Sequence, residues 1–289
     1  MTFTTTLESK NGTAVQIGSE HPFAIIGERI NPTGRSMLTE ELIAGDMTRV
    51  RADALAQVAA GARVLDINAG VPGYDEAKML SDAVRAVQEA VDVPVCIDTS
   101  TFSALEPALM AVEGKPLINS VTGEDESLEL ILPLVKKYGT AVIGMANDDS
   151  GISMDVDDRF KAAKKIVDAA TDFGIPREDV IIDPLAMTVG AIPDAGRTTL
   201  ATIRRVHEEL GVNLSCGASN MSFGLPDRHA VDAAFLPMAI FAGMHCAITN
   251  PLADVVRKSV LAADVLLGQD EYSVTWIKAH RAEQAAQAG

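Results

Sequence analysis

Short apolar runs alternate with longer amphipathic segments along almost the whole chain. Eight of the runs are rich in Val, Ile, Ala and Cys and have the length of β-strands. They cover residues 23–28, 63–68, 93–98, 116–120, 140–145, 179–183, 213–219 and 245–249. Polar residues do not alternate within them, which is typical of parallel strands buried on both faces.

The segments between these runs carry helical periodicity. Examples span residues 47–61, 82–91, 128–139, 159–174 and 252–268. Glycines end several of these segments, where a left-handed helix cap favours glycine. They are Gly61, Gly139, Gly174 and Gly268.

Eight strands that are each followed by a helix predict a closed parallel barrel or a doubly wound sheet. The number eight and the 289-residue length favour the barrel, so we predict the α/β class and a (β/α)8 TIM barrel. No linker rich in Pro, Gly or Ser interrupts the alternation, which indicates a single domain. We expect an N-terminal lead-in over 1–22, the barrel over 23–268 and a C-terminal tail over 269–289.

Composition narrows the classes of partner and compartment. The formal net charge of −16 and the absence of a basic stripe argue against nucleic-acid binding. The first residues lack the pattern of a secretory signal, and no apolar run approaches 18 residues, so we expect a cytoplasmic protein without a membrane span. Cys96, Cys216 and Cys246 each lie in an apolar run, which predicts reduced, buried thiols.

Acids and amides occur where the predicted strands end. They are Glu28, Asp66, Asn68, Asp98, Asn119, Asp183 and, just after the seventh strand, Asn220. Any one of them could be a helix cap or a turn residue. Capping does not explain the whole set, and barrel enzymes build their sites at this end of the strands. We therefore predict a ligand site there.

The chemistry of these side chains indicates a ligand that is rich in N–H donors. The five histidines are scattered and no HExxH or CxxC motif occurs, so we expect no bound metal. No Gly-rich loop or basic pair that could hold a phosphate follows a strand. A pterin ring presents an amino group beside a ring N–H, and one carboxylate can accept hydrogen bonds from both donors. A guanidino or purine ligand would satisfy the same reasoning.

Six segments resemble the pterin-binding methyltransferase family. They are IIGERINPTG (25–34), GARVLDINAG (61–70), VCIDTS (95–100), PLINSVTGE (116–124), VIIDPL (180–185) and GASNMSFGLPDR (217–228). That family includes methyltetrahydrofolate:corrinoid protein methyltransferases and the folate domain of cobalamin-dependent methionine synthase. The resemblance covers residues 23–268 and implies a TIM barrel that binds tetrahydrofolate or 5-methyltetrahydrofolate as its substrate.

The resemblance also implies roles for individual residues. Asp98, Asn119 and Asp183 would bind the pterin edge, and Asn220 would reach N5, the atom that carries the methyl group. Glu28 and Arg228 match further ligand-contacting positions, although Arg228 could instead pair with Asp227 or Asp232 on the surface. Asp66 and Asn68 are weaker candidates that would support their neighbours.

In this interpretation the cobalamin is carried by a separate corrinoid protein that docks transiently over the mouth of the barrel. Asp227-Arg228-His229 begins like the corrinoid-binding DxHxxG motif, but Asp232 occupies the glycine position. The family also implies a homodimer. Two alternatives are a dihydropteroate synthase-like enzyme, whose basic motif after the seventh strand is replaced by Ser219-Asn220-Met221, and a non-catalytic folate-binding subunit. A phosphate-binding barrel would need the missing phosphate loop.

Overall fold

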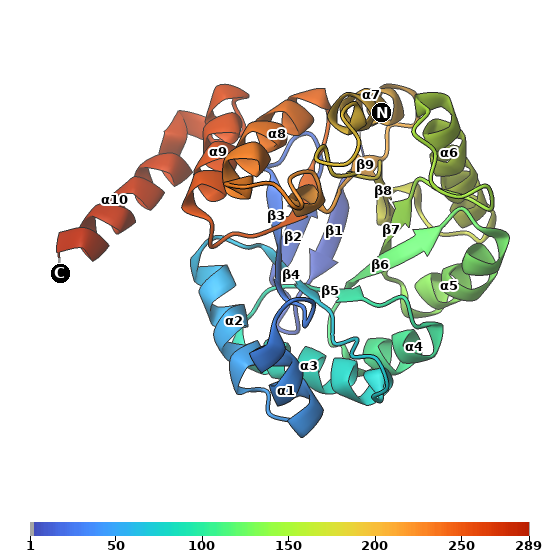
Figure 1. The fold of residues 1–289 in the computed structure, drawn as a ribbon, viewed down its shortest axis with the longest axis horizontal. Coiled ribbons are helices and arrows are strands. Elements are labelled where there is room, and N and C mark those ends of the chain that lie inside the picture. Colours follow the sequence, from blue (N-terminus) through green and yellow to red (C-terminus); the bar gives the residue numbers. More distant parts are fainter. Residues whose placement is uncertain (1–2, 289) are drawn as a thin grey trace.

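A computed structural model, which describes residues 3–288, places eight parallel strands at the centre of a ring of helices (Figure 1). The barrel strands are β3 (Ala24–Ile30), β4 (Val64–Ile67), β5 (Val95–Asp98), β6 (Leu117–Thr122), β7 (Ala141–Met145), β8 (Val180–Asp183), β9 (Asn213–Leu214) and β10 (Cys246–Thr249). They pair in chain order, and β10 returns to β3. Backbone hydrogen bonds close the gap between β9 and β10, where His245 N donates to Leu214 O at 3.1 Å. The predicted single-domain TIM barrel is confirmed.

The helices lie between successive strands and cover the outside of the barrel. They are α1 (Ser36–Ala44), α2 (Thr48–Ala59), α3 (Glu76–Ala90), α4 (Phe102–Ala111), α5 (Asp125–Tyr138), α6 (Val156–Asp172), α7 (Ala195–Glu209), α8 (Arg228–Ala242) and α9 (Asp254–Leu266). Short 3-10 turns occur at η1 (Arg177–Asp179), η2 (Ala218–Asn220) and η3 (Glu271–Ser273). Gly139 and Gly174 end their helices with φ of +62° and +74°, the left-handed conformation that the sequence predicts.

The chain before the barrel forms a hairpin of two antiparallel strands, β1 (Thr5–Glu8) and β2 (Ala14–Ile17). The sequence predicts only a lead-in here. Leu7, Val15 and Ile17 are buried in one cluster with Ala24 and Ile26 at the start of β3. The hairpin therefore closes the amino end of the barrel, so that a ligand can enter only from the opposite end.

The predicted tail is largely helical. Helix α10 (Val274–Ala288) follows η3 and extends away from the barrel (Figure 1). Its Glu283 pairs with Arg257 and, at 3.0 Å, with Lys258 of α9. Within residues 3–288, no helix combines the length and apolar character that crossing a membrane requires. All three cysteines are buried free thiols, as the apolar runs predict.

Candidate functional site

The acids and amides at the strand ends face the inside of the barrel because strand side chains alternate between two faces. In β5, Cys96 belongs to the apolar cluster inside the barrel, and Asp98 follows two residues later. The same spacing separates Ile26 from Glu28, Val64 from Asp66, Leu117 from Asn119 and Ile181 from Asp183. The carboxyl end of the barrel therefore carries a polar layer above an apolar one.

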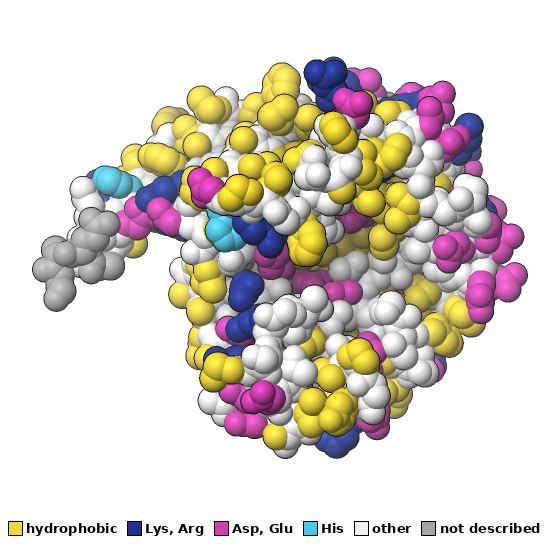
Figure 2. All heavy atoms as spheres, in the orientation of Figure 1, with side chains coloured by type: hydrophobic (Ala, Val, Ile, Leu, Met, Phe, Trp, Pro, Cys, Tyr) yellow, Lys and Arg dark blue, Asp and Glu magenta, His cyan; other side chains and the backbone are white. Residues whose placement is uncertain are grey.

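A cavity of about 350 Å³ opens above this polar layer. The predicted residues that line it are Glu28, Asp66, Asp98, Asn119, Asp183, Asn220 and Arg228. In Figure 2 it is the hollow at the centre of the face, with acidic side chains on its floor. Asn68 is not among the lining residues. Its Nδ2 donates to Oδ2 of Asp98 at 3.1 Å, so it orients that carboxylate from outside the cavity.

Asp66 lies deeper than the other acids. Its side chain is buried, and Nδ2 of Asn119 donates to its Oδ1 at 3.3 Å. Burial and the nearby charge of Asp98 raise the pKa of Asp66 well above its usual range. The carboxyl group of Asp66 thus holds the amide of Asn119, and its role toward a ligand stays a prediction.

Two carboxyl groups at the cavity are poised to change protonation near neutral pH. Burial raises the pKa of Asp98 to about 6, although the hydrogen bond from Asn68 opposes the shift. Burial also raises the pKa of Asp183 to about 6, against the hydrogen bond from Leu185 N to its Oδ1 at 2.7 Å. A ligand that donates two hydrogen bonds would favour the ionised forms, since hydrogen bonds to a carboxylate lower its pKa.

The loop after β9 places Asn220 at the mouth. The chain leaves the strand earlier than predicted and makes the 3-10 turn η2, in which Asn220 N donates to Gly217 O at 3.0 Å. A β-carbon on Gly217 would lie only 2.8 Å from Nδ2 of Asn220. Glycine at 217 therefore leaves room for the Asn220 amide. Ser219 in the same turn donates to Oε1 of Glu28 at 2.9 Å.

The structure adds arginines that the sequence analysis did not assign to the site. Arg29 and Arg35, from β3 and the loop after it, line the cavity together with Arg228. The residues at the strand ends predicted a site without cations, and the two additional arginines correct this prediction. Alternation places Arg29 on the face opposite to Glu28, but the register of β3 shifts between Gly27 and Ile30, which the sequence pattern did not reveal.

Arg228 lies at the start of α8 and points toward the loop. Its Nε donates to Ser222 Oγ at 3.2 Å, and its guanidinium also donates to Ser219 O. In the described chain it forms no ion pair with Asp227 or Asp232, which removes the surface ion-pair alternative as an account of this side chain. Arg228 thus stabilises the turn that carries Asn220.

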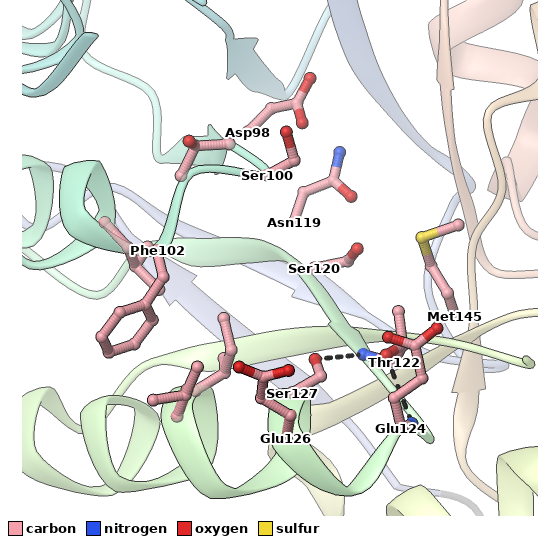
Figure 3. Close-up of a pocket in the computed structure, with 14 residues that line it drawn as sticks. Asp98, Ser100, Phe102, Asn119, Ser120, Thr122, Glu124, Glu126, Ser127 and Met145 are labelled. Carbon is pink, nitrogen blue, oxygen red and sulfur yellow. Dashed lines mark hydrogen bonds between the residues drawn. The ribbon is translucent and has the colours of Figure 1, made fainter. Parts of the chain in front are cut away.

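A second cavity of about 460 Å³ adjoins the first between α4 and α5, and the two share Asp98, Asn119 and Met145. Figure 3 shows Phe102 on one side of it and Glu126 and Ser127 on the other. Ser127 accepts a hydrogen bond from Thr122 N at 3.0 Å, which fixes the start of α5 against β6. The mouth therefore has a side lobe with apolar walls and an acidic edge.

The comparison with protein families identifies the class to which this barrel belongs. Residues 27–250 match the family described as pterin binding enzyme, so the chain belongs to that family. It is 30% identical to the methylcorrinoid:tetrahydrofolate methyltransferase of Eubacterium limosum, over 89% of this chain and 96% of that one. It is also 27% identical to methionine synthase of Mycobacterium leprae, over 82% of this chain but only 21% of that larger protein.

Solved structures of dihydropteroate synthases share the fold. The enzyme from Xanthomonas albilineans in complex with 7,8-dihydropteroate matches with a TM-score of 0.68 and 19% identity, over 90% of this chain and 98% of that one. The enzyme from Stenotrophomonas maltophilia matches with a TM-score of 0.68 and 20% identity, over 90% and 97%. At this identity the likeness shows the common barrel and does not favour the dihydropteroate synthase alternative.

Proposed function

We propose that this protein is a methyltransferase that moves a methyl group between N5 of tetrahydrofolate and the cobalt of a separate corrinoid protein. One observation carries the proposal. Asp98, Asn119 and Asp183 meet at one cavity in a chain whose relative along almost the full length is a methylcorrinoid:tetrahydrofolate methyltransferase. The catalytic class is supported by that relative, and the residue roles are those that the family resemblance implies, supported by the shared cavity.

The pterin ring would lie across the polar layer with its donor edge toward the carboxylates. Asp98 and Asp183 would accept hydrogen bonds from the amino group and ring N–H groups, while Asn119 can both donate and accept. Paired donors on a carboxylate form strong, charge-assisted hydrogen bonds. Asp66 beneath would hold Asn119 in place, and Asn68 would hold Asp98.

Asn220 is the residue that we assign to the reacting atom. In transfer to tetrahydrofolate the lone pair of N5 forms the new N–C bond, the cobalt–carbon bond breaks, and its electron pair stays on cobalt. The N5 proton then leaves to solvent. In the opposite direction the electron pair on cobalt would form the new cobalt–carbon bond, the N–C bond would break with its electron pair returning to N5, and N5 would regain a proton. An asparagine amide can accept from N5–H through Oδ1 and donate to the N5 lone pair through Nδ2, so it can stabilise charge at N5 in both directions.

The corrinoid partner would dock on the rim of the mouth. Exposed apolar side chains follow four of the barrel strands, three of them on loops and one at the first residue of α4, and they are Tyr74, Phe102, Ile152 and Phe223. Such a ring of apolar groups around a polar cavity is suited to a large macrocycle and its protein carrier. Transient contact suffices, because the cobalt must approach the methyl group and then leave.

A homodimer through α8 and α9 is part of the proposal. Figure 2 shows hydrophobic side chains gathered over these helices, and Met238 and Phe241 of α8 are 55% and 73% exposed. Apolar patches of this kind mark protein interfaces. Light scattering of the purified chain should give twice the 30.5 kDa chain mass, and Phe241→Lys should halve it.

The transfer assay tests the function directly. Under anoxic conditions the chain is mixed with tetrahydrofolate and a methylated corrinoid protein, and loss of the methyl–cobalt absorbance is compared with 5-methyltetrahydrofolate formed. Asn220→Ala should lower the rate about 100-fold, as loss of one transition-state hydrogen bond does, while the folate dissociation constant changes little. Asn250→Ala, on the next loop and outside the cavity lining, is the control. Absence of any transfer by the wild type contradicts the function, and equal losses of rate and affinity contradict the role of Asn220.

A further inference from the structure

Three arginines line the mouth of a chain whose formal net charge is −16. Two of them are engaged by the protein itself. Arg35 holds Asp53 through two hydrogen bonds at 2.6 and 3.2 Å, so its charge is compensated by a carboxylate. Arg228 holds the η2 loop through Ser219 and Ser222.

Arg29 differs from both. Its guanidinium forms no hydrogen bond and no ion pair within the described residues, although it is half-buried and lines the cavity. The charge that lies near it is that of Glu28, whose pKa it helps to lower against the effect of burial. A guanidinium whose donors the described residues do not use can bind a carboxylate through two parallel hydrogen bonds.

The charges around the mouth are not evenly distributed. The lining of the adjoining lobe includes Asp98, Glu124 and Glu126 and no lysine or arginine, whereas the lining of the main cavity sets three arginines against four acids. Figure 2 shows basic side chains next to the acidic floor of the hollow. An anionic extension of a bound ligand would therefore be repelled from the lobe between α4 and α5 and attracted to the side of β3.

We propose that Arg29 binds a carboxylate of the aminobenzoylglutamate arm of the reduced folate, an inference that rests on the proposed function. The arm leaves the pterin ring at the carbon beside N5. Asn220, assigned to N5, lines the same cavity as Arg29, so the arm starts on the basic side of the mouth. Arg29 thus selects ligands that carry the acidic arm over bare pterins, and it directs the arm away from the lobe next to Asp98.

The test compares two ligands that differ only in charge. One is 5-methyltetrahydrofolate, and the other is its diamide, in which both glutamate carboxylates are carboxamides. Calorimetry at low salt should show that the wild type binds the acid roughly tenfold more tightly than the diamide, the range of a half-exposed charge-assisted pair. Arg29→Met should make the two affinities about equal by weakening only the binding of the acid. Arg29→Lys should retain most of the tenfold difference.

Arg85→Gln, which removes an exposed positive charge from α3, is the matched control and should leave the ratio unchanged. A ratio that persists in Arg29→Met overturns the proposal. So does an equal loss for both ligands, which would indicate a structural role for Arg29. Failure of the wild type to bind either ligand would instead contradict the proposed function, so the two failures are distinguishable.

Discussion

Asp183 should lower the stability of the ligand-free protein, and its replacement by Asn should reveal this cost. The pKa of the buried carboxyl is about 6, whereas its ordinary value is 3.8. Each unit of difference between the two pKa values corresponds to about 1.4 kcal/mol, so the ionised group lowers the free energy of unfolding by up to about 3 kcal/mol above pH 7. Solvent in the cavity screens part of this, and we expect about 1–3 kcal/mol.

The sign follows from which state binds the proton more tightly. Since the pKa of Asp183 is raised in the folded state, the stability that its protonated form contributes is fully present below pH 3.8 and is lost as pH rises through 6. Asp183→Asn removes the ionisation but keeps an oxygen that can accept the hydrogen bond from Leu185 N. The variant should therefore be more stable than the wild type by about 1–3 kcal/mol at pH 8 and by roughly half as much at pH 5.

Urea unfolding followed by circular dichroism measures these differences, with no ligand present. Asp168→Asn, an exposed substitution on α6, is the control and should change the free energy of unfolding by less than about 0.5 kcal/mol at both pH values. The same Asp183→Asn variant should lose folate binding by about 100-fold, because an amide has only one acceptor oxygen and its NH2 group would face one of the ligand's donors. A variant that is no more stable at pH 8, or equally stabilised at both pH values, refutes the reasoning.

The remaining predictions concern the same mouth. Below pH 6 Asp98 and Asp183 take up protons, so folate affinity should fall by roughly tenfold per pH unit for each of the two groups. Calorimetry in buffers of different ionisation heat should detect proton release on binding at pH 6. Gly217→Ala should displace the Asn220 amide, because its nitrogen would lie 2.8 Å from the new β-carbon. Methyl transfer should become slower, while thermal stability and folate affinity should change little. A transfer rate like that of the wild type would argue against a fixed amide. Arg159→Met should cost about 2–4 kcal/mol in urea unfolding because the fully buried guanidinium donates to Ser153 O, Pro184 O and Leu185 O, and Arg159→Lys should recover only part of the loss.

Local pattern was sufficient to predict the strands that build the floor of the site. In a strand, residues two positions apart point to the same face. Once the strand was predicted, Cys96 and Asp98 therefore had to face the barrel interior together. The seventh strand was the weakest assignment. The apolar run at 213–219 reads as one strand, but β9 ends at Leu214 and the turn η2 begins at Ala218. Ser219 in this turn donates to Glu28 from a distant strand and accepts from the nearby Arg228.

The sequence by itself determined the barrel, the end of it that carries chemistry, and the acids and amides that converge there, since these depend on strand periodicity and on the parallel order of eight similar units. Only the tertiary structure decided which cations reach the cavity, that the β1–β2 hairpin covers the other end, and which carboxyl groups have a pKa of about 6. Those properties depend on burial and on neighbours brought together from distant positions, and a pattern along the chain carries no record of such distances.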